Sequence, residues 1–158
     1  WILDFAFSAE RLEQMRELAQ PGVFGQGLVS DFLFAKDALF ARLTLSDEDH
    51  ALYTGIYRRF EPQVPVPDLV IWLRAPVPVL RERIARRAIP MEQDIAPDYL
   101  ARLDAGYAAL FEAHPGLPVL AIDTEGFNPV DRDEDFERLL DRLARFRGPR
   151  EHWLGARD

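Results

Sequence analysis

Four arginines lie in one stretch, residues 81–100, with the sequence RERIARRAIPMEQDIAPDYL. Arg83 and Arg87 are four residues apart, so they share one face of a helix, with Arg86 beside them. The helix is expected to break near Pro90, and Glu92 follows in the break.

Two interpretations of this stretch stay open. Basic residues near a helix C-terminus are favoured by the helix dipole, which predicts only a capped, solvated helix. Alternatively, the stretch is a mobile lid whose arginines clamp a phosphoryl group during its transfer, while Glu92 accepts a sugar hydroxyl. Fixed positive charge near phosphoryl oxygens is the main catalytic device in that chemistry.

The elements around this stretch alternate between strands and helices. Near-continuous apolar runs at 69–73 and 118–122 predict central strands buried on both faces, and a short run at 28–30 predicts another strand. Apolar spacing and capping residues predict helices over 2–19, 32–42, 46–60, 77–88, 97–113 and 133–146. The pattern indicates an α/β domain with a parallel sheet flanked by helices.

Ligands of parallel sheets usually bind beyond the carboxyl ends of the strands. In this chain those ends are expected at Ser30-Asp31, at residues 74–76 and at residues 123–125. These three segments are therefore candidates for a binding site.

Composition limits the class of protein. The 158 residues are 48% hydrophobic and 29% charged, which fits a single domain over residues 1–158. A formal net charge of −8 argues against a general nucleic-acid binder. No apolar run approaches ~20 residues, so we expect a cytoplasmic protein without a membrane partner. The absence of cysteine and the wide spacing of the three histidines predict no zinc site.

Three ordered motifs resemble the deoxynucleoside kinase family, particularly its bacterial deoxyadenosine and deoxyguanosine kinases. They are GLVSDFLFAKDALFARLTL, PDLVIWLRAP followed by VLRERIARR, and PVLAIDTEGF. The likeness extends from about Leu3 to Phe146. It implies a P-loop kinase-like fold, and the third motif would lead to the loop that contacts the adenine of the phosphate donor.

The resemblance assigns catalytic roles to three residues. Asp31 would be the acid near Mg²⁺ and the phosphates of ATP, and Arg83 and Arg87 would be lid arginines. An alternative for Asp31 is that it merely caps the helix that follows. The arginine that often follows the family's acid is replaced here by Phe32, and a further lid arginine is replaced by Ile89.

Four residues would bind the nucleoside. By the resemblance, Asp37 would hydrogen-bond the base with help from Arg11, and Glu92 would bind the 3′-hydroxyl. Asp4 stands where the family commonly has a glutamine, and an ionised aspartate can only accept hydrogen bonds. The alternative for Asp37 and Arg11 is that both are solvated helix residues.

The phosphate-binding loop of such kinases is not found in this sequence. That loop is rich in glycine and ends in Lys-Ser/Thr, whereas Lys36 is the only lysine and no Gly-Lys pair occurs. The family places the loop, its flanking strands and a catalytic glutamate before the point where this chain begins. We therefore expect the first βαβ unit to lie outside this chain; a diverged, inactive paralogue is the alternative.

The resemblance thus implies an ATP-dependent deoxynucleoside 5′-kinase of nucleotide salvage that forms a homodimer. A second hypothesis is a catalytically inactive subunit or scaffold that acts through protein–protein contacts. A third, a related kinase such as a thymidylate kinase, would be expected to carry more basic residues for a substrate phosphate.

Overall fold

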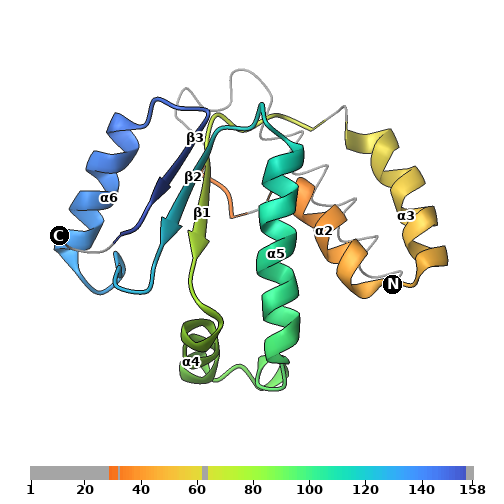
Figure 1. Ribbon diagram of the computed structural model, residues 1–158, viewed down its shortest axis with the longest axis horizontal. Coiled ribbons are helices and arrows are strands. Elements are labelled where there is room, and N and C mark those ends of the chain that lie inside the picture. The colour runs from red at the N-terminus through yellow and green to blue at the C-terminus, as the bar shows by residue number, and fades with distance from the viewer. Residues whose placement is uncertain (1–28, 32, 62–63, 156–158) are drawn as a thin grey trace. The chain divides into compact units, whose positions relative to one another are not determined.

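The computed structural model describes residues 29–31, 33–61 and 64–155 (Figure 1). The chain forms two compact units, with the boundary in the sequence between Val66 and Pro67, and each is described by itself. The predicted helix over 2–19 lies outside the described residues, as do Asp4, Arg11 and Phe32.

The first unit contains two described helices, α2 (Ala35–Thr44) and α3 (Asp47–Phe60). Ser46 caps α3 as predicted, because its hydroxyl accepts a hydrogen bond from the Asp49 amide at 3.2 Å. The Phe34 ring stacks on Tyr57 of α3 with 4.8 Å between centroids. This contact holds the start of α2 against α3.

The prediction of a strand at 28–30 is wrong for the two of these residues that the structure describes. Val29 and Ser30 belong to no strand, and Val29 is 97% exposed. A three-residue apolar run gains little as a strand unless another strand pairs with it and its side chains are buried.

The second unit is a three-stranded parallel sheet with helices around it. Its elements in chain order are β1 (Val70–Arg74), α4 (Val77–Arg87), the 3₁₀ turn η2 (Pro90–Glu92), α5 (Pro97–Ala113), β2 (Val119–Asp123), α6 (Asp133–Arg145) and β3 (Arg150–Trp153). The strand order is β1-β2-β3, and the register pairs Leu73 with Ile122 and Ala121 with His152. Except for β3 and η2, which were not predicted, each element lies within a few residues of its predicted position.

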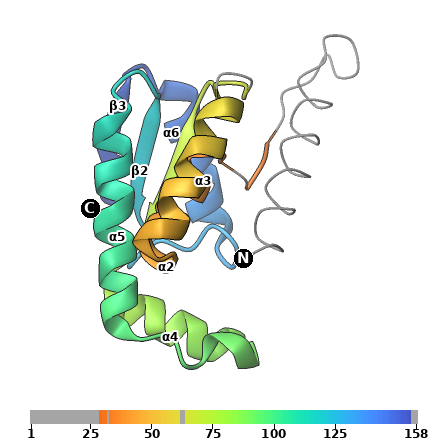
Figure 2. The ribbon, with the colours of Figure 1, turned by 90° about the vertical axis from the view of Figure 1, so that its right-hand side faces the viewer.

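Helices α5 and α6 lie on opposite sides of this sheet (Figures 1 and 2). On the α6 side, Leu139 and Leu143 pack against a core of Leu120, Ile122 and Phe127. On the α5 side, three aromatic rings contact one another: Trp72, Tyr107 and Phe111. Burial of each large apolar side chain contributes about 1.5–3 kcal/mol, so both faces stabilise the sheet.

The two predicted central strands differ in burial. In β2, the four residues from Val119 to Ile122 are all buried, as predicted. In β1 the side chains alternate between half-buried and exposed, and Ile71 and Leu73 are 40% and 61% exposed. The prediction that both faces of β1 are buried is wrong, because β1 is the outer strand of the described sheet and α6 packs over β2 and β3.

No helix in the described part of the chain is long and apolar enough to cross a membrane.

Candidate functional site

Helix α4 lies beyond the carboxyl ends of the strands, next to the start of α5 (Figures 1 and 2). Two residues separate β1 from α4, and Pro76 forms the N-cap, where its carbonyl accepts the Leu80 amide at 3.0 Å. Pro78 in the first turn and arginines in the last turn suit a helix in this direction. The short connection therefore places an arginine-rich helix at the end of the sheet beyond which ligands of parallel sheets usually bind.

The helix ends at Ala88, which adopts a left-handed conformation with φ 53°. Its amide donates to the carbonyls of Ile84 and Ala85, both at 3.2 Å, which closes the last turn. The chain then reverses into η2, as the predicted break near Pro90 requires.

Arg83 is bound to one residue of the sheet. Its Nη1 donates to the Thr124 hydroxyl at 2.7 Å, and its Nη2 donates to the Thr124 carbonyl at 2.5 Å. Thr124 immediately follows β2 and is 6% exposed. A predicted lid arginine is thus anchored at the carboxyl end of the central strand.

Thr124 is itself tied to β1. Its amide and its hydroxyl both donate to the Arg74 carbonyl, each at 2.7 Å. Its hydroxyl therefore donates to Arg74 and accepts from Arg83. The ends of β1 and β2 and helix α4 meet at this one side chain.

Arg87 and Glu92 form an ion pair across the break after α4. The Arg87 side chain is 60% exposed, whereas that of Glu92 is 27% exposed. The side-chain Nε2 of Gln93 strengthens the turn by donating to the carbonyls of Ile84 and Ile89, at 3.1 and 3.2 Å. The structure therefore brings together the predicted clamp arginine and the predicted sugar-binding glutamate.

The loop between β2 and α6 is held by a buried carboxylate. Asp135 is fully buried, and its oxygens lie 2.9 Å from Arg132 Nε and 3.3 Å from Arg138 Nη1. The same carboxylate accepts the Asn128 amide at 2.9 Å. Arg132 also donates to the Gly126 carbonyl at 2.9 Å, so the loop that begins at Thr124 has a defined course.

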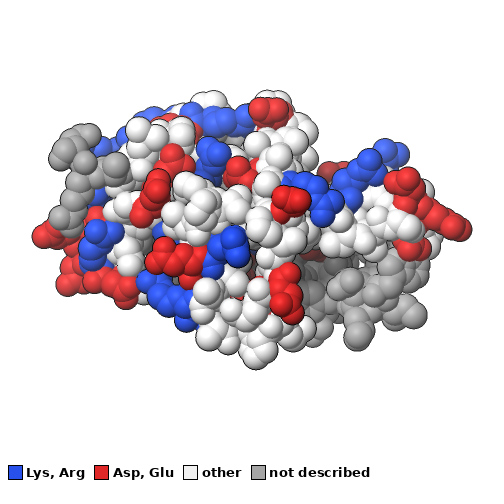
Figure 3. Space-filling view, turned by 60° about the horizontal axis from the view of Figure 1, so that its bottom comes forward, with Lys and Arg blue, Asp and Glu red and all other residues white. Residues whose placement is uncertain are grey.

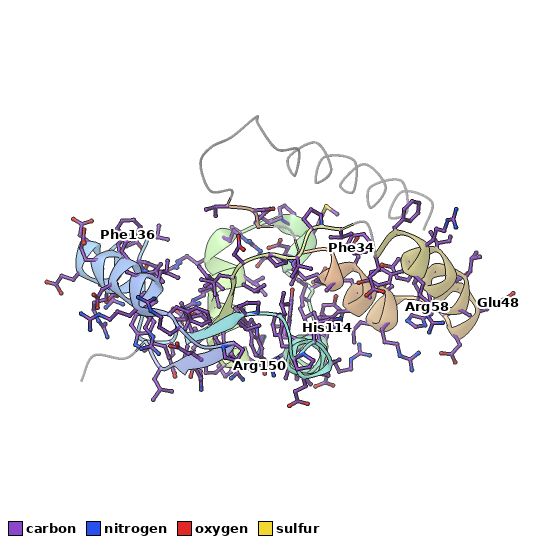
Figure 4. The ribbon with its side chains drawn as sticks, turned by 90° about the horizontal axis from the view of Figure 1, so that it is seen from above. Phe34, Glu48, Arg58, His114, Phe136 and Arg150 are labelled. Carbon is purple, nitrogen blue, oxygen red and sulfur yellow. The ribbon has the colours of Figure 1, made fainter. Side chains whose placement is uncertain are left out.

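Two further polar contacts lie at the edge of the sheet. His152 Nε2 on β3 lies 3.1 Å from the Asp123 carboxylate at the end of β2. Arg150, also on β3, reaches the C-terminal end of α5, where it donates to the His114 carbonyl at 3.3 Å (Figure 4). The sequence had marked residues 123–125 as a strand end, but β3 and its contacts were missed.

Two predicted residues of the first unit, Asp31 and Asp37, belong to the described part of the chain. Asp31 is exposed, and its backbone carbonyl accepts a 3.4 Å hydrogen bond from Lys36 Nζ. Asp31 does not cap α2, because Phe34 occupies the N-cap position and provides no side-chain hydrogen bond. The capping alternative for Asp31 is therefore wrong.

Asp37 lies in the first turn of α2 and is half-buried, close to two tyrosines of α3. Burial, together with the negative charges of Glu61 and Asp37, raises the pKa of Tyr57 to about 12. Burial and the charge of Asp37 also raise the pKa of Tyr53. These tyrosines were not among the predicted site residues.

The positive charge of α4 is a local feature. On the face shown in Figure 3, basic and acidic side chains are interspersed, without a broad area of one sign. Among the described residues no group of three or more metal-ligating side chains occurs.

Comparison with known proteins identifies relatives over most of this chain. The chain is 32% identical over 142 residues to the deoxyguanosine kinase of Bacillus subtilis (strain 168), an alignment that covers 87% of this chain and 69% of that protein. It is 28% identical over 134 residues to mouse NADH dehydrogenase [ubiquinone] 1 alpha subcomplex subunit 10, mitochondrial, with 83% of this chain and 38% of that protein covered.

A solved structure has the same fold. Deoxyadenosine kinase from M. mycoides, determined with bound dCTP, superimposes with a TM-score of 0.63 at 20% sequence identity, over 89% of this chain and 72% of that one. The deoxynucleoside kinase family model matches residues 2–147. The α/β sheet, the arginine-bearing helix beyond its strands and these matches lead to one conclusion: the chain belongs to the deoxynucleoside kinase family.

Proposed function

We propose that this protein transfers the γ-phosphate of ATP to the 5′-hydroxyl of a deoxynucleoside in nucleotide salvage, and that this chain supplies the lid and nucleoside side of the site. The observation that carries the proposal is the Arg87–Glu92 pair beyond the carboxyl ends of the strands. In this proposal Arg87 would bind the transferred phosphoryl group and Glu92 would accept the 3′-hydroxyl, so one short turn would contact both the phosphoryl group and the sugar.

The arginines act by neutralising charge. In an in-line displacement, negative charge is spread over the oxygens of the transferred phosphoryl group. Arg87 is exposed enough to leave Glu92 and bind those oxygens, and Arg83 lies one helical turn away on α4. Since arginine offers a planar fork of N–H donors, it suits phosphoryl oxygens better than a lysine does.

Asp31 is proposed as the carboxylate near the metal. In kinases Mg²⁺ is typically held by one or two carboxylates together with phosphate oxygens, so the exposed Asp31 carboxylate fits this role without a cluster of ligands. Bound Mg²⁺ would lower the charge repulsion between the phosphates and the attacking oxygen. Asp31 would help to hold the phosphate end of the donor in place.

Recognition of the nucleoside is assigned to four residues. Asp37 would accept hydrogen bonds from the base, with help from Arg11, and Glu92 would accept the 3′-hydroxyl. Asp4 would be a further acceptor toward the base. The half-buried surroundings of Asp37, next to Tyr53 and Tyr57, support a recognition role, because a hydrogen bond to a base is stronger away from water.

The proposal is tested with the full-length gene product. The coding sequence upstream of Trp1 is expected to encode a glycine-rich loop that ends in Lys-Ser/Thr, and purified protein is expected to phosphorylate at least one of the four deoxynucleosides with ATP and Mg²⁺. Absence of the loop from the gene, or no product with any deoxynucleoside, would refute the kinase proposal. Light scattering of the same protein tests the expected homodimer.

A second candidate is a catalytically inactive subunit or scaffold. The similarity to a protein named as an NADH dehydrogenase subunit favours it, together with Asp4 and Ile89 at positions where the family commonly has glutamine and arginine. This candidate predicts no phosphorylation, together with stable co-purification of a partner protein from the native source. A monodisperse, active enzyme without a partner would exclude it.

A further inference from the structure

Thr124 is the polar residue on which three separate segments converge. Its hydroxyl and carbonyl accept the two Nη groups of Arg83, while its amide and hydroxyl donate to the Arg74 carbonyl. A threonine that is 6% exposed and uses all of its polar groups in this way is held in one conformation. Thr124 therefore holds the Arg83 guanidinium, which donates to it, in a fixed position.

The geometry points to Thr124 as a positioning residue for Arg83, an inference that rests on the proposed kinase function. Thr124 occupies the Nη1 and Nη2 end of the guanidinium, and neither bond uses Nε. An arginine has five N–H donors in a rigid fork, so donors on the Nε side stay directed elsewhere. Thr124 thereby sets the plane and the direction of the charge that Arg83 presents to a phosphoryl group.

The same contact positions the rest of the lid. Arg83 lies four residues before Arg87 on the same face of α4, so fixing Arg83 at the end of β2 also fixes the direction in which Arg87 leaves the helix. Small displacements of groups that orient a reacting phosphate can lower a rate about 100-fold. Loss of the Thr124 hydroxyl is therefore expected to act on catalysis more than on nucleoside binding.

A pair of substitutions in the full-length protein tests the inference. Thr124→Val keeps the side-chain shape but removes the hydroxyl, and Thr124→Ser keeps the hydroxyl. We expect T124V to lower kcat roughly 10- to 100-fold with the nucleoside KM within about twofold, and T124S to stay within about threefold of the wild type. In an R83M background, T124V is expected to have little further effect, because each change breaks the same contact between Arg83 and the Thr124 hydroxyl.

Amide hydrogen exchange of α4 provides a readout that does not depend on activity. T124V and R83M are each expected to speed exchange of the α4 amides, and the double variant no more than the larger of the two; R81A, at an exposed site of the same helix, is the control. An active wild type whose kcat is unchanged in T124V overturns this inference alone. An inactive wild type overturns the proposed function, while the exchange data still show whether the Arg83–Thr124 contact exists in solution.

Discussion

The guanidinium of Arg87 and the carboxylate of Glu92 are paired across the turn that follows α4. Exposed ion pairs of this kind contribute at most about 1 kcal/mol to stability, since water competes for both charges. The pair therefore contributes little to the stability of the fold. Under the proposed function, the pair keeps the lid arginine next to the sugar-binding glutamate, and each side chain could exchange its partner for a substrate.

Under the proposed function, Arg87→Ala in the full-length protein is expected to lower kcat by at least about 100-fold, because Arg87 would neutralise charge in the transition state. The fold should be unaffected, since the side chain is 60% exposed. Arg86→Ala is the matched control, at the neighbouring exposed arginine, and should leave kcat near the wild-type value. Steady-state kinetics with saturating ATP measure both, and an R87A enzyme with wild-type kcat contradicts the clamp role.

Much of this arrangement could be predicted from local patterns. The apolar runs before Arg74 and Thr124 marked the strands, and Ser46 marked the start of α3. Strand β3 was missed because Arg150 to Trp153 has polar residues at three of its four positions, and its strand conformation depends on pairing with β2.

The contacts of the site depend on tertiary structure. Arg83 and Thr124 are 41 residues apart, and no spacing rule joins a helix face to the residue after a distant strand. The exposure of Leu73 was missed for a similar reason, because an apolar run does not reveal which strand lies at the edge of a sheet. Periodicity predicts elements, whereas packing decides which side chains meet.

Under the proposed function, Asp37→Ala is expected to raise the deoxynucleoside KM about 10-fold or more, with a smaller effect on kcat, because the half-buried carboxylate that would accept from the base is lost. Glu48→Ala, at an exposed acidic position on α3, is the control for a general change in charge (Figure 4). Initial rates over a range of nucleoside concentrations separate the two constants. An unchanged KM in D37A would show that the base is recognised elsewhere.

Tyr57 predicts a loss of stability in strong base. Its pKa is raised to about 12 by burial and by the charges of Glu61 and Asp37, against 10 for an unperturbed tyrosine. The folded state therefore holds the proton more tightly, so its stabilising effect is complete below pH 10 and is lost as the pH rises toward 12. Urea unfolding between pH 9 and about 11.5 should show a decline that is smaller in Tyr57→Phe. An equal decline in both proteins would contradict the shift.

Asp135→Ala is expected to destabilise the protein by about 1–3 kcal/mol, because it removes the acceptor of the Asn128 amide and the carboxylate that Arg132 and Arg138 contact, while these arginines are exposed enough to be hydrated. Asp133→Ala, an exposed acid in the same first turn of α6, should cost about 1 kcal/mol or less. Chemical denaturation measures both free energies of unfolding. Equal values for the two variants would mean that the carboxylate does not organise the loop.

Gly155→Ala tests how closely the chain after β3 approaches the end of β2. Gly155 has φ +64°, and a Cβ at this position would lie 2.2 Å from the Asp123 carbonyl oxygen and 3.1 Å from the Phe127 Cβ. The first of these contacts is with backbone, which cannot rotate away, and the positive φ adds strain of about 1–3 kcal/mol for a residue with a side chain. We expect G155A to lower the free energy of unfolding by more than this amount. Gly116→Ala, with nothing within 4 Å of the added carbon, is the control and should stay within about 1 kcal/mol of the wild type. Similar midpoints for the two variants in urea unfolding would mean that the segment after Trp153 does not lie against Asp123 in solution.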